Sequence, residues 1–353
     1  MSSPEHSSLP ISRWGVGDVE VGRRVIVRRE LSATEAAESG KKVTDVIGHV
    51  VSMDPFQVRP QVRAGVRADD SVPAVDFTDK KVVIVKALPD HPVRNSDIRA
   101  VELATAKAFP GIEHTMCGGW LLRAGDGITE RSNSALPAGP SAGTQPVPIE
   151  EIRQFYARHN LPVRIAVPDR ICKPAEALVK QPGWELGPEI VVMTRSLDRN
   201  LPELTSPSPH IRVDIANQPV QEWLDLYHFR GQALPPHALN LLRQEIDGRM
   251  CFGRLIYDDG KHTPRTVAIT RGTLTDSDDG RTWLGFSAVE VTEDMRRQGL
   301  GTLMGNHMMY WGAENGATDA YLQVVAKNSA GIALYRGLGF TEHHRHRYAI
   351  WAR

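Results

Sequence analysis

Apolar residues recur at three- and four-residue steps over residues 300–311, which predicts a helix with one apolar face. A strand-like run, 283–291, precedes this helix, and a second run, 320–325, follows it. Asn328 then stands where a second helix needs an N-cap. This part of the chain therefore predicts strands and helices in alternation, which is a mixed α/β pattern of the α+β class.

The first part of the chain has a different pattern. Residues 11–88 hold short β-rich runs, separated by turn residues, at 24–28, 43–51, 74–77 and 81–85. These short strands predict a small barrel, and Val16-Gly17-Asp18 resembles the start of SH3-like barrels. Residues 1–89 contain 13 basic and 12 acidic residues with few aromatics, which argues against nucleic-acid binding. We expect a structural barrel or one that binds a protein partner.

Composition excludes several classes of protein. The 353 residues suffice for two or three domains, and 42 basic side chains balance 42 acidic ones, so no global charge favours nucleic acid or a membrane. Three cysteines lie far apart without metal or redox spacing, as expected for buried thiols in a reducing compartment. No apolar run reaches membrane-spanning length, and the polar first residues lack the core of a signal peptide. These features predict a cytoplasmic protein.

The turn before the helix 300–311 predicts an anion site. It reads Arg296-Arg297-Gln298-Gly299-Leu300-Gly301-Thr302. The first amides of a helix lack intrahelical partners, and the helix dipole adds positive potential there. Glycines allow a phosphate to approach the backbone, and arginines add charge-assisted hydrogen bonds. A P-loop would need Lys-Ser/Thr after the last glycine, and a dinucleotide fingerprint would need a glycine in place of Met304, so neither fits.

The loop resembles the pyrophosphate loop of the GCN5-related N-acetyltransferases, the GNAT superfamily. Their motif is Gln/Arg-x-x-Gly-x-Gly/Ala after a strand that ends in valine, and here Val291 precedes Arg296-x-x-Gly299-x-Gly301. A second family block follows in order at Leu322-Gln323-Val324, Asn328, Ala330, Tyr335 and Gly339-Phe340. The resemblance covers about residues 209–353 and implies a GNAT fold that uses acetyl-coenzyme A as cosubstrate.

The resemblance also implies roles for single residues. Backbone amides near Val289 and Val291, the loop from Arg296 to Thr302, and Asn328 would bind the coenzyme. Tyr335, two helical turns after Asn328, would lie beside the coenzyme sulfur as general acid. A tyrosine with a pKa of about 10 stays protonated at neutral pH and can donate to a thiolate. Without the glycine loop, Tyr335 would be read as a core tyrosine.

The general base has two readings. Counting by twos along Leu284, Phe286, Ala288 and Glu290 puts one acid on an otherwise apolar strand face. Glu290 is then either a carboxylate near the thioester or the point where the strand reaches solvent, and a bulge would change its face.

Three histidines near the C-terminus suggest a metal cluster at first sight. His344 and His346 share one face of a probable strand, and His343 lies on the other face. No cysteine or carboxylate pattern completes the set, so we expect no metal.

The middle of the chain carries a weak internal repeat. Residues 178–184 can be laid over 334–340, which places Val179 at the position of Tyr335. The loop 143–148 lacks the glycine pattern, and Pro146 and Pro148 remove two amides from it. We therefore predict a barrel at 11–88, a degenerate GNAT unit at 89–198, a proline-rich linker at 199–209 and a catalytic GNAT unit at 210–353.

The function that this pattern predicts is an acetyl-coenzyme A-dependent N-acetyltransferase. The acceptor is a primary amine, either a protein lysine or N-terminus or a small amine, and its pocket should involve residues 227–239. The alternative function is an acyl-coenzyme A-binding regulator or scaffold without turnover, which would keep the glycine loop but would not need Tyr335.

Overall fold

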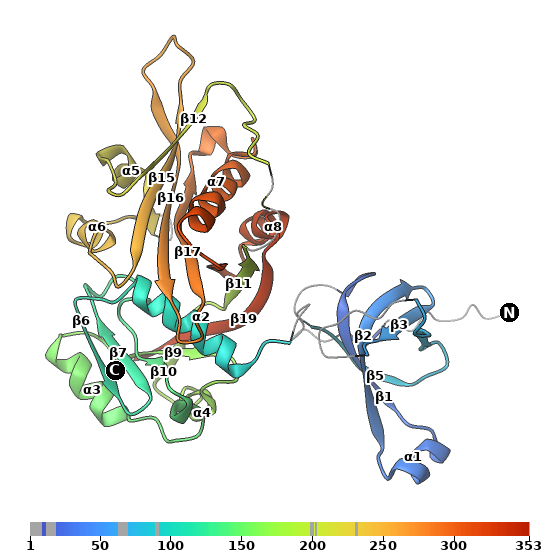
Figure 1. Ribbon diagram of the computed structural model, residues 1–353. Helices are drawn as coiled ribbons and strands as arrows, with labels where there is room; N and C mark the ends of the chain where they lie inside the picture. Colours follow the sequence, from blue (N-terminus) through green and yellow to red (C-terminus); the bar gives the residue numbers. More distant parts are fainter. Residues whose placement is uncertain are drawn as a thin grey trace. The chain divides into compact units, whose positions relative to one another are not determined.

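The computed structural model describes residues 9–11, 19–62, 70–88, 92–197, 201, 203–229 and 232–352 (Figure 1). Most of the polar first residues, the Val16-Gly17-Asp18 motif and part of the linker predicted at 199–209 lie outside these ranges. The chain forms two compact units, Met1–Val93 and Arg94–Arg353.

The N-terminal unit is a five-stranded antiparallel sheet in the order β4-β3-β2-β1-β5. Its elements are β1 Arg24–Glu30, α1 Ala33–Ser39, β2 Val43–Met53, β3 Phe56–Pro60, β4 Val75–Asp76 and β5 Val82–Ala87. The four strands expected from the sequence are present, whereas β3 and α1 were missed. The capping box formed by Ser32 and Glu35 is the sequence signal that marks α1. A core centred on Val25, Val27 and Val58 belongs to this unit alone.

The C-terminal unit alternates helices and strands through two successive runs of elements. The first run comprises α2 Asn95–Ala108, β6 Glu113–Cys117, β7 Trp120–Ala124, β8 Leu136–Pro137, α3 Ile149–Arg158, β9 Arg164–Pro168, α4 Lys173–Leu178, β10 Trp184–Leu186 and β11 Ile190–Ser196. The second run comprises β12 Ile211–Ala216, α5 Gln221–Leu226, β13 His228–Phe229, β14 Gln232–Ala233, α6 Pro236–Leu242, β15 Arg249–Tyr257, β16 Arg265–Asp276, β17 Thr282–Val291, α7 Leu300–Glu314, β18 Asp319–Val325, α8 Ser329–Gly337 and β19 Thr341–Trp351.

The two runs share one sheet. Among the described residues, nine strands join in the order β10-β19-β11-β18-β17-β16-β15-β12, with β9 paired to β19 off this path. Strand β11 from the first run lies between β18 and β19 of the second, antiparallel to both, and Figure 1 shows β11 beside β19. The later part of β19 pairs in turn with β9. The regions that the sequence separates at 199–209 therefore lie in one compact unit, and the residue limits of the three predicted domains stay predictions.

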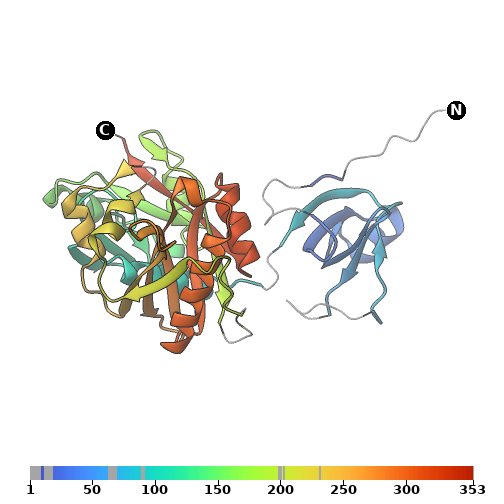
Figure 2. The ribbon, with the colours of Figure 1, turned by 90° about the horizontal axis from the view of Figure 1, so that it is seen from above.

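Helices cover both faces of the large sheet, as Figures 1 and 2 show. Neighbouring residues of β16 point to opposite faces, so that Gly272 faces Met308 of α7 while Arg271 donates to the carbonyls of Ala108 in α2 and Leu242 in α6. One face is thus covered by α7, and the other by α2 with α5 and α6. The main apolar core lies between the sheet and α7.

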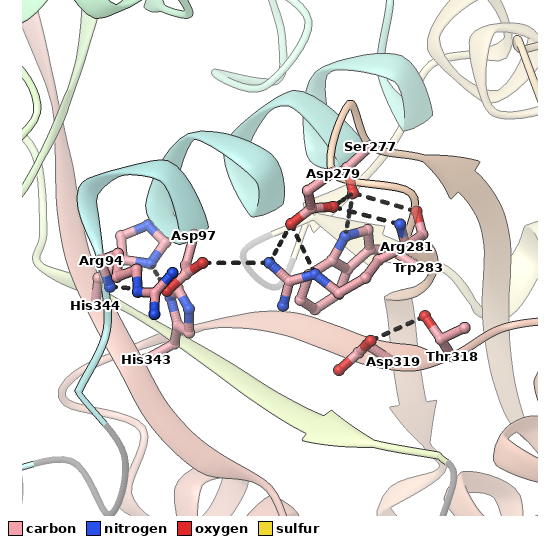
Figure 3. A network of polar contacts seen from close by, with 10 residues as sticks. All are labelled: Arg94, Asp97, Ser277, Asp279, Arg281, Trp283, Thr318, Asp319, His343 and His344. Atoms are coloured by element: carbon pink, nitrogen blue, oxygen red, sulfur yellow. Dashed lines mark hydrogen bonds and ion pairs between the residues drawn. The ribbon is translucent and has the colours of Figure 1, made fainter. Parts of the chain in front are cut away.

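A polar network ties the start of α2 to the turn between β16 and β17 (Figure 3). Arg281 of the turn pairs with Asp97 of α2 at 3.5 Å and also contacts Asp279. Its guanidinium lies 4.7 Å from the ring centroid of Trp283, whose Nε1 donates to Ser277 Oγ at 2.9 Å. These contacts fix α2 against the sheet next to the strand that carries the predicted site.

The close packing of β17 against β18 gives a test of this arrangement. A Cβ at Gly285 would lie 2.5 Å from Tyr321 Oη and 2.8 Å from Thr273 Oγ1, and Tyr321 is buried. Gly285→Ala should therefore lower the free energy of unfolding by about 1–3 kcal/mol. Chemical denaturation would measure it. Gly337→Ala is the matched control, because a Cβ there meets nothing within 4 Å and alanine favours a helix. Equal stability of the two variants would contradict the packing.

Candidate functional site

Strands β17 and β18 separate partway along their length. They pair in parallel from Trp283 with Asp319 to Phe286 with Leu322, and no pairing is recorded beyond that point in these described strands. Strand β18 continues to Val325 against β11 on its other edge. The facing edges of residues 287–291 and 323–325 therefore leave backbone groups that a ligand lying between them can bind.

A β-bulge accompanies this separation. Arg271 of β16 pairs with Ser287, but Ile269, two residues back, pairs with Glu290, three residues on. The extra residue falls at Ala288, whose φ of 53° is unusual for a residue with a Cβ. The bulge is the local feature that bends β17 away from β18.

The bulge corrects the face assigned to Glu290 from the sequence. Counting by twos placed Glu290 with Leu284 and Phe286, whose side chains lie in the core under α7. Glu290 instead lies opposite Ile269, which packs with the residues of α5 and α6 on the other face. The inserted residue shifts the alternation by one, so Val289 and Val291 take the α7 side and contact its core.

Glu290 lies next to the segment 227–239 that was predicted to form the acceptor pocket. Burial raises the pKa of Glu290, and the backbone amide of His228 and the charge of Arg296 oppose that shift. Burial raises the pKa of Tyr227, and the charge of Glu290 adds to this shift. The half-buried Glu290 is therefore not simply a strand end in solvent. Residues 230 and 231 of the segment lie outside the described part of the chain.

The glycine loop has a defined backbone shape. Arg297 and Gly299 are both left-handed, with φ values of 63° and 80°, and α7 begins at Leu300. No side chain caps this helix, within the described residues. The amides of Leu300, Gly301 and Thr302 belong to the first helical turn, where the helix offers no carbonyl partner. The loop therefore presents free amides at the positive end of a helix dipole.

The polar side chains of the loop are used in different ways. Arg296 donates from Nε to the carbonyl of Val291 at 3.1 Å and lies 3.5 Å from Glu293, so it braces the end of β17. Gln298 folds back to the carbonyl of Asp294. Arg297 is exposed and has no ion pair or hydrogen bond to another described residue. Arg297 is thus the arginine of this loop that is left for an anion.

Gly301 has a packing role that the sequence did not reveal. A Cβ at this position would lie 3.1 Å from Leu334 Cδ2 of α8. The missing side chain therefore also lets the start of α7 approach α8, which carries Tyr335.

Tyr335 is joined to the point of strand separation by aromatic contacts. Its ring packs edge-on against Phe340, with centroids 6.1 Å apart, and Phe340 packs in the same way against Phe286, the last β17 residue paired with β18. Burial raises the pKa of Tyr335 to about 12. No hydrogen bond of its hydroxyl to another described residue is found, so a neutral O–H donor is available on the α8 side of the opening.

Asn328 caps α8, as predicted, because its Oδ1 accepts from the amide of Gly331 at 2.9 Å. Its role toward a coenzyme stays a prediction.

Gln323 is a residue of the site that the sequence reading passed over. It follows Leu322, the last β18 residue paired with β17. Its Nε2 is buried and has no hydrogen-bond partner among the described residues. By alternation it shares a face with Tyr321, which packs against α2 rather than α7. Its place in the family block was visible in the sequence, but the unsatisfied amide was not.

Comparison with known proteins agrees with this geometry. Residues 95–349 match the family model described as "Probable histone acetyltransferase Rv0428c C-terminal". The "Probable histone acetyltransferase Rv0428c" of Mycobacterium tuberculosis is 34% identical over 330 residues, 93% of this chain and 94% of that protein. The chain belongs to the GCN5-related N-acetyltransferase superfamily. It is also 26% identical to the "Uncharacterized N-acetyltransferase YobR" of Bacillus subtilis, over 72% of this chain and 98% of that protein.

The fold of this acetyltransferase recurs in a solved structure. A GCN5-related N-acetyltransferase from Kribbella flavida aligns with a TM-score of 0.53 at 17% identity, covering 71% of this chain and 94% of that one. The expected mixed α/β GNAT fold is thus confirmed.

The N-terminal unit of the acetyltransferase receives a more specific description. Residues 19–86 match the family model "Rv0428c N-terminal Sm-like domain". The SH3-like barrel expected from the sequence is therefore a small Sm-like domain, and its sheet is open because β4 and β5 stand at opposite edges. Among the described helices, none combines the length and apolar character needed to cross a membrane.

The loop geometry predicts a charge-specific loss of coenzyme binding. Gly301→Asp adds a negative charge to the first turn of α7, close to the amides that would bind a pyrophosphate, and should abolish acetyl-coenzyme A binding in calorimetry. Gly301→Ala is the matched control: it adds the same Cβ against Leu334 without the charge and should retain most of the affinity. Near-native affinity in a folded Gly301→Asp variant would refute the loop as the anion site.

Proposed function

We propose that this acetyltransferase moves the acetyl group of acetyl-coenzyme A to a primary amine, at one site in its C-terminal half. The observation that carries the proposal is the opening between β17 and β18, which leads to the free amides at the start of α7. An extended thioester arm can lie in the opening while its pyrophosphate meets the helix end.

The coenzyme contacts follow from this arrangement. The backbone from Arg296 to Thr302 receives the pyrophosphate, with Arg297 as the free cation. The backbone of Val289 and Val291, on the unpaired edge of β17, holds the pantetheine or the carbonyl oxygen. Asn328 orients the coenzyme at the start of α8. Gln323 supplies a further unpaired N–H donor from the opposite edge of the opening.

The chemistry is direct attack of the amine on the thioester. The nitrogen forms a bond to the carbonyl carbon, and the resulting tetrahedral oxyanion collapses as the C–S bond breaks. Glu290 takes the proton that the amine loses, directly or through water, and Tyr335 gives a proton to the departing thiolate. The two groups suit this division, because Glu290 faces the α5–α6 side and Tyr335 comes from α8. The acceptor thus enters beside residues 227–239 and meets the coenzyme at the opening.

A protein amine is the favoured acceptor class. The Mycobacterium tuberculosis relative carries the name probable histone acetyltransferase, which supports a protein lysine. An N-terminal amine and a small amine are the alternative acceptors in the turnover experiment below. The Sm-like domain, which carries no group needed for the chemistry, is proposed to bind the protein partner.

Turnover with defined amines tests the proposal. Full-length protein is incubated with acetyl-coenzyme A and a library of lysine peptides, N-terminal peptides and small amines, and free thiol and product mass are measured. Thiol release with an acetylated amine supports the enzyme. Saturation at one coenzyme per chain supports a single site, whereas two equivalents would oppose it. Tight coenzyme binding without any product would instead indicate the acyl-coenzyme A regulator.

The acid role of Tyr335 predicts a rate effect without a binding effect. Tyr335→Phe keeps the ring against Phe340 and should lower kcat by roughly 10²–10⁴-fold, with coenzyme affinity little changed. If Tyr335 were only a core residue, the variant would lose at most about 1 kcal/mol of folding stability and would keep the parent's kcat. Single-turnover measurements avoid masking by slow product release. A folded variant within about threefold of the parent would exclude an essential acid.

The base role of Glu290 predicts a shifted pH profile. A general base works only when ionised, so the rate should fall as pH drops through the pKa of Glu290. Because burial raises that pKa, the acidic limb should lie above the usual value of about 4.3. Glu290→Gln should lower kcat and remove this limb, while Glu314→Gln, an exposed acid at the end of α7, should preserve it. An unchanged limb in Glu290→Gln would assign the base elsewhere.

A further inference from the structure

Three side chains far apart in the sequence meet in the interior of the C-terminal unit. Glu102 comes from α2, and His344 and His346 come from β19. Glu102 Oε1 lies 2.8 Å from His344 Nε2 and 2.8 Å from His346 Nδ1. Each of the three side chains is at most 3% exposed. The sequence reading placed both histidines on one face but could not find the carboxylate, which stands more than two hundred residues earlier.

We propose that Glu102, His344 and His346 bind a divalent metal ion, with zinc as the metal that best suits imidazole and carboxylate donors. One donor atom from each residue lies within 4.8 Å of the others, which is a compact ligand set. Bidentate binding by the carboxylate, or one water, supplies a fourth donor. This assignment replaces the expectation of no metal, which rested on the apparent lack of a carboxylate.

The surroundings of His344 match those of a metal ligand. Its second nitrogen, Nδ1, lies 2.8 Å from Nδ1 of His343. A histidine that binds metal commonly donates its other N–H to a neighbouring acceptor, which fixes the ring and its tautomer. His343 can accept that N–H through Nδ1, and this leaves the lone pair on Nε2 of His344 directed at Glu102.

Charge and hydrogen bonding point the same way. The ion pairs found for Glu102 with other described residues are those to the two histidines, and the buried Arg123 adds only an attraction beyond ion-pair distance. Because Oε1 of Glu102 can only accept, each facing histidine nitrogen must carry a proton or share a metal ion with it.

The geometry needs only a small opening to hold the ion. Zinc–ligand bonds of about 2.0–2.1 Å in a tetrahedral shell separate the donors by roughly 3.3 Å. The nitrogen–oxygen distances of 2.8 Å must therefore lengthen by about half an ångström. Such a site would fasten α2 to β19, the strand that pairs with both β11 and β9. Its role would be structural, holding the two runs of elements together.

Metal content tests the proposal independently of acetyl transfer. Full-length protein, purified without a metal-affinity step, is loaded with Zn²⁺ or Co²⁺, passed through a desalting column and assayed by elemental analysis. We expect about one ion per chain, visible ligand-field bands for Co²⁺, and a melting temperature that falls on chelation. Retention of only trace metal by the folded parent, with no Co²⁺ bands, would overturn the site and assign a proton-balanced triad.

Variants locate the ion. His344→Gln and His346→Gln should each lose the retained metal. His262→Gln is the matched control, since His262 forms an exposed pair with Asp259 at 2.8 Å, and it should keep about one ion per chain. Loss of metal in His262→Gln with retention in the other two would place the ion elsewhere. Because the metal content of the parent protein is measured directly, the proposal can be tested even if a variant folds poorly.

Discussion

The bulge at Ala288 is the constraint on which the candidate site depends. It inserts one residue into β17 opposite β16, holds Ala288 at a φ of 53° and ends the pairing of β17 with β18 at Phe286. A residue with a Cβ in this conformation costs on the order of 1 kcal/mol or more, and unpaired strand edges leave polar groups without partners. The strained backbone at Ala288 persists because the surrounding sheet enforces it, and a ligand can bind the unpaired amides and carbonyls of the strand edges. The same bulge turns Glu290 toward α5 and α6. One local irregularity therefore accounts for both the opening and the position of the carboxylate beside it.

The opening also depends on the other edge of β18. Strand β11 pairs with β18 over its full length, from Ile190 with Val325 to Ser196 with Asp319. This partner satisfies one side of β18, so β18 can remain a strand after β17 has left it. Strand β11 belongs to the region predicted to be a degenerate GNAT unit, where Pro146 and Pro148 stand in the loop and Val179 is laid over Tyr335. A region without the predicted phosphate loop and tyrosine can therefore still be required, because it supplies the strand that keeps β18 in place.

Local signals explain what the sequence predicted. The apolar spacing after Gly299 predicted α7, and Asn328 predicted the cap of α8, because both depend on residues within a few positions of each other. The face of Glu290 could not be predicted, since a bulge is set by register against β16 and not by alternation along β17. Glu102 was missed for a similar reason: its partners on β19 are brought to it by the tertiary fold alone. Sequence therefore predicts local elements such as α7 and the cap of α8 well, and it predicts poorly which side chains the tertiary fold brings together.

In the proposed phosphate site, the arginines of the loop should contribute less than its backbone amides. Arg296 is engaged with the carbonyl of Val291, and exposed ion pairs such as that with Glu293 contribute only about 0–1 kcal/mol. Each hydrogen bond from a backbone amide to a charged oxygen contributes about 1.5–3 kcal/mol, and the amides of Leu300, Gly301 and Thr302 are all in the first turn. Arg297 and Gly299 both adopt the left-handed conformation in the turn that precedes these amides, a conformation found in backbone anion sites. The backbone amides should therefore contribute more to phosphate binding than the arginine side chains. This explains why the motif specifies glycines, which let a phosphate approach the backbone.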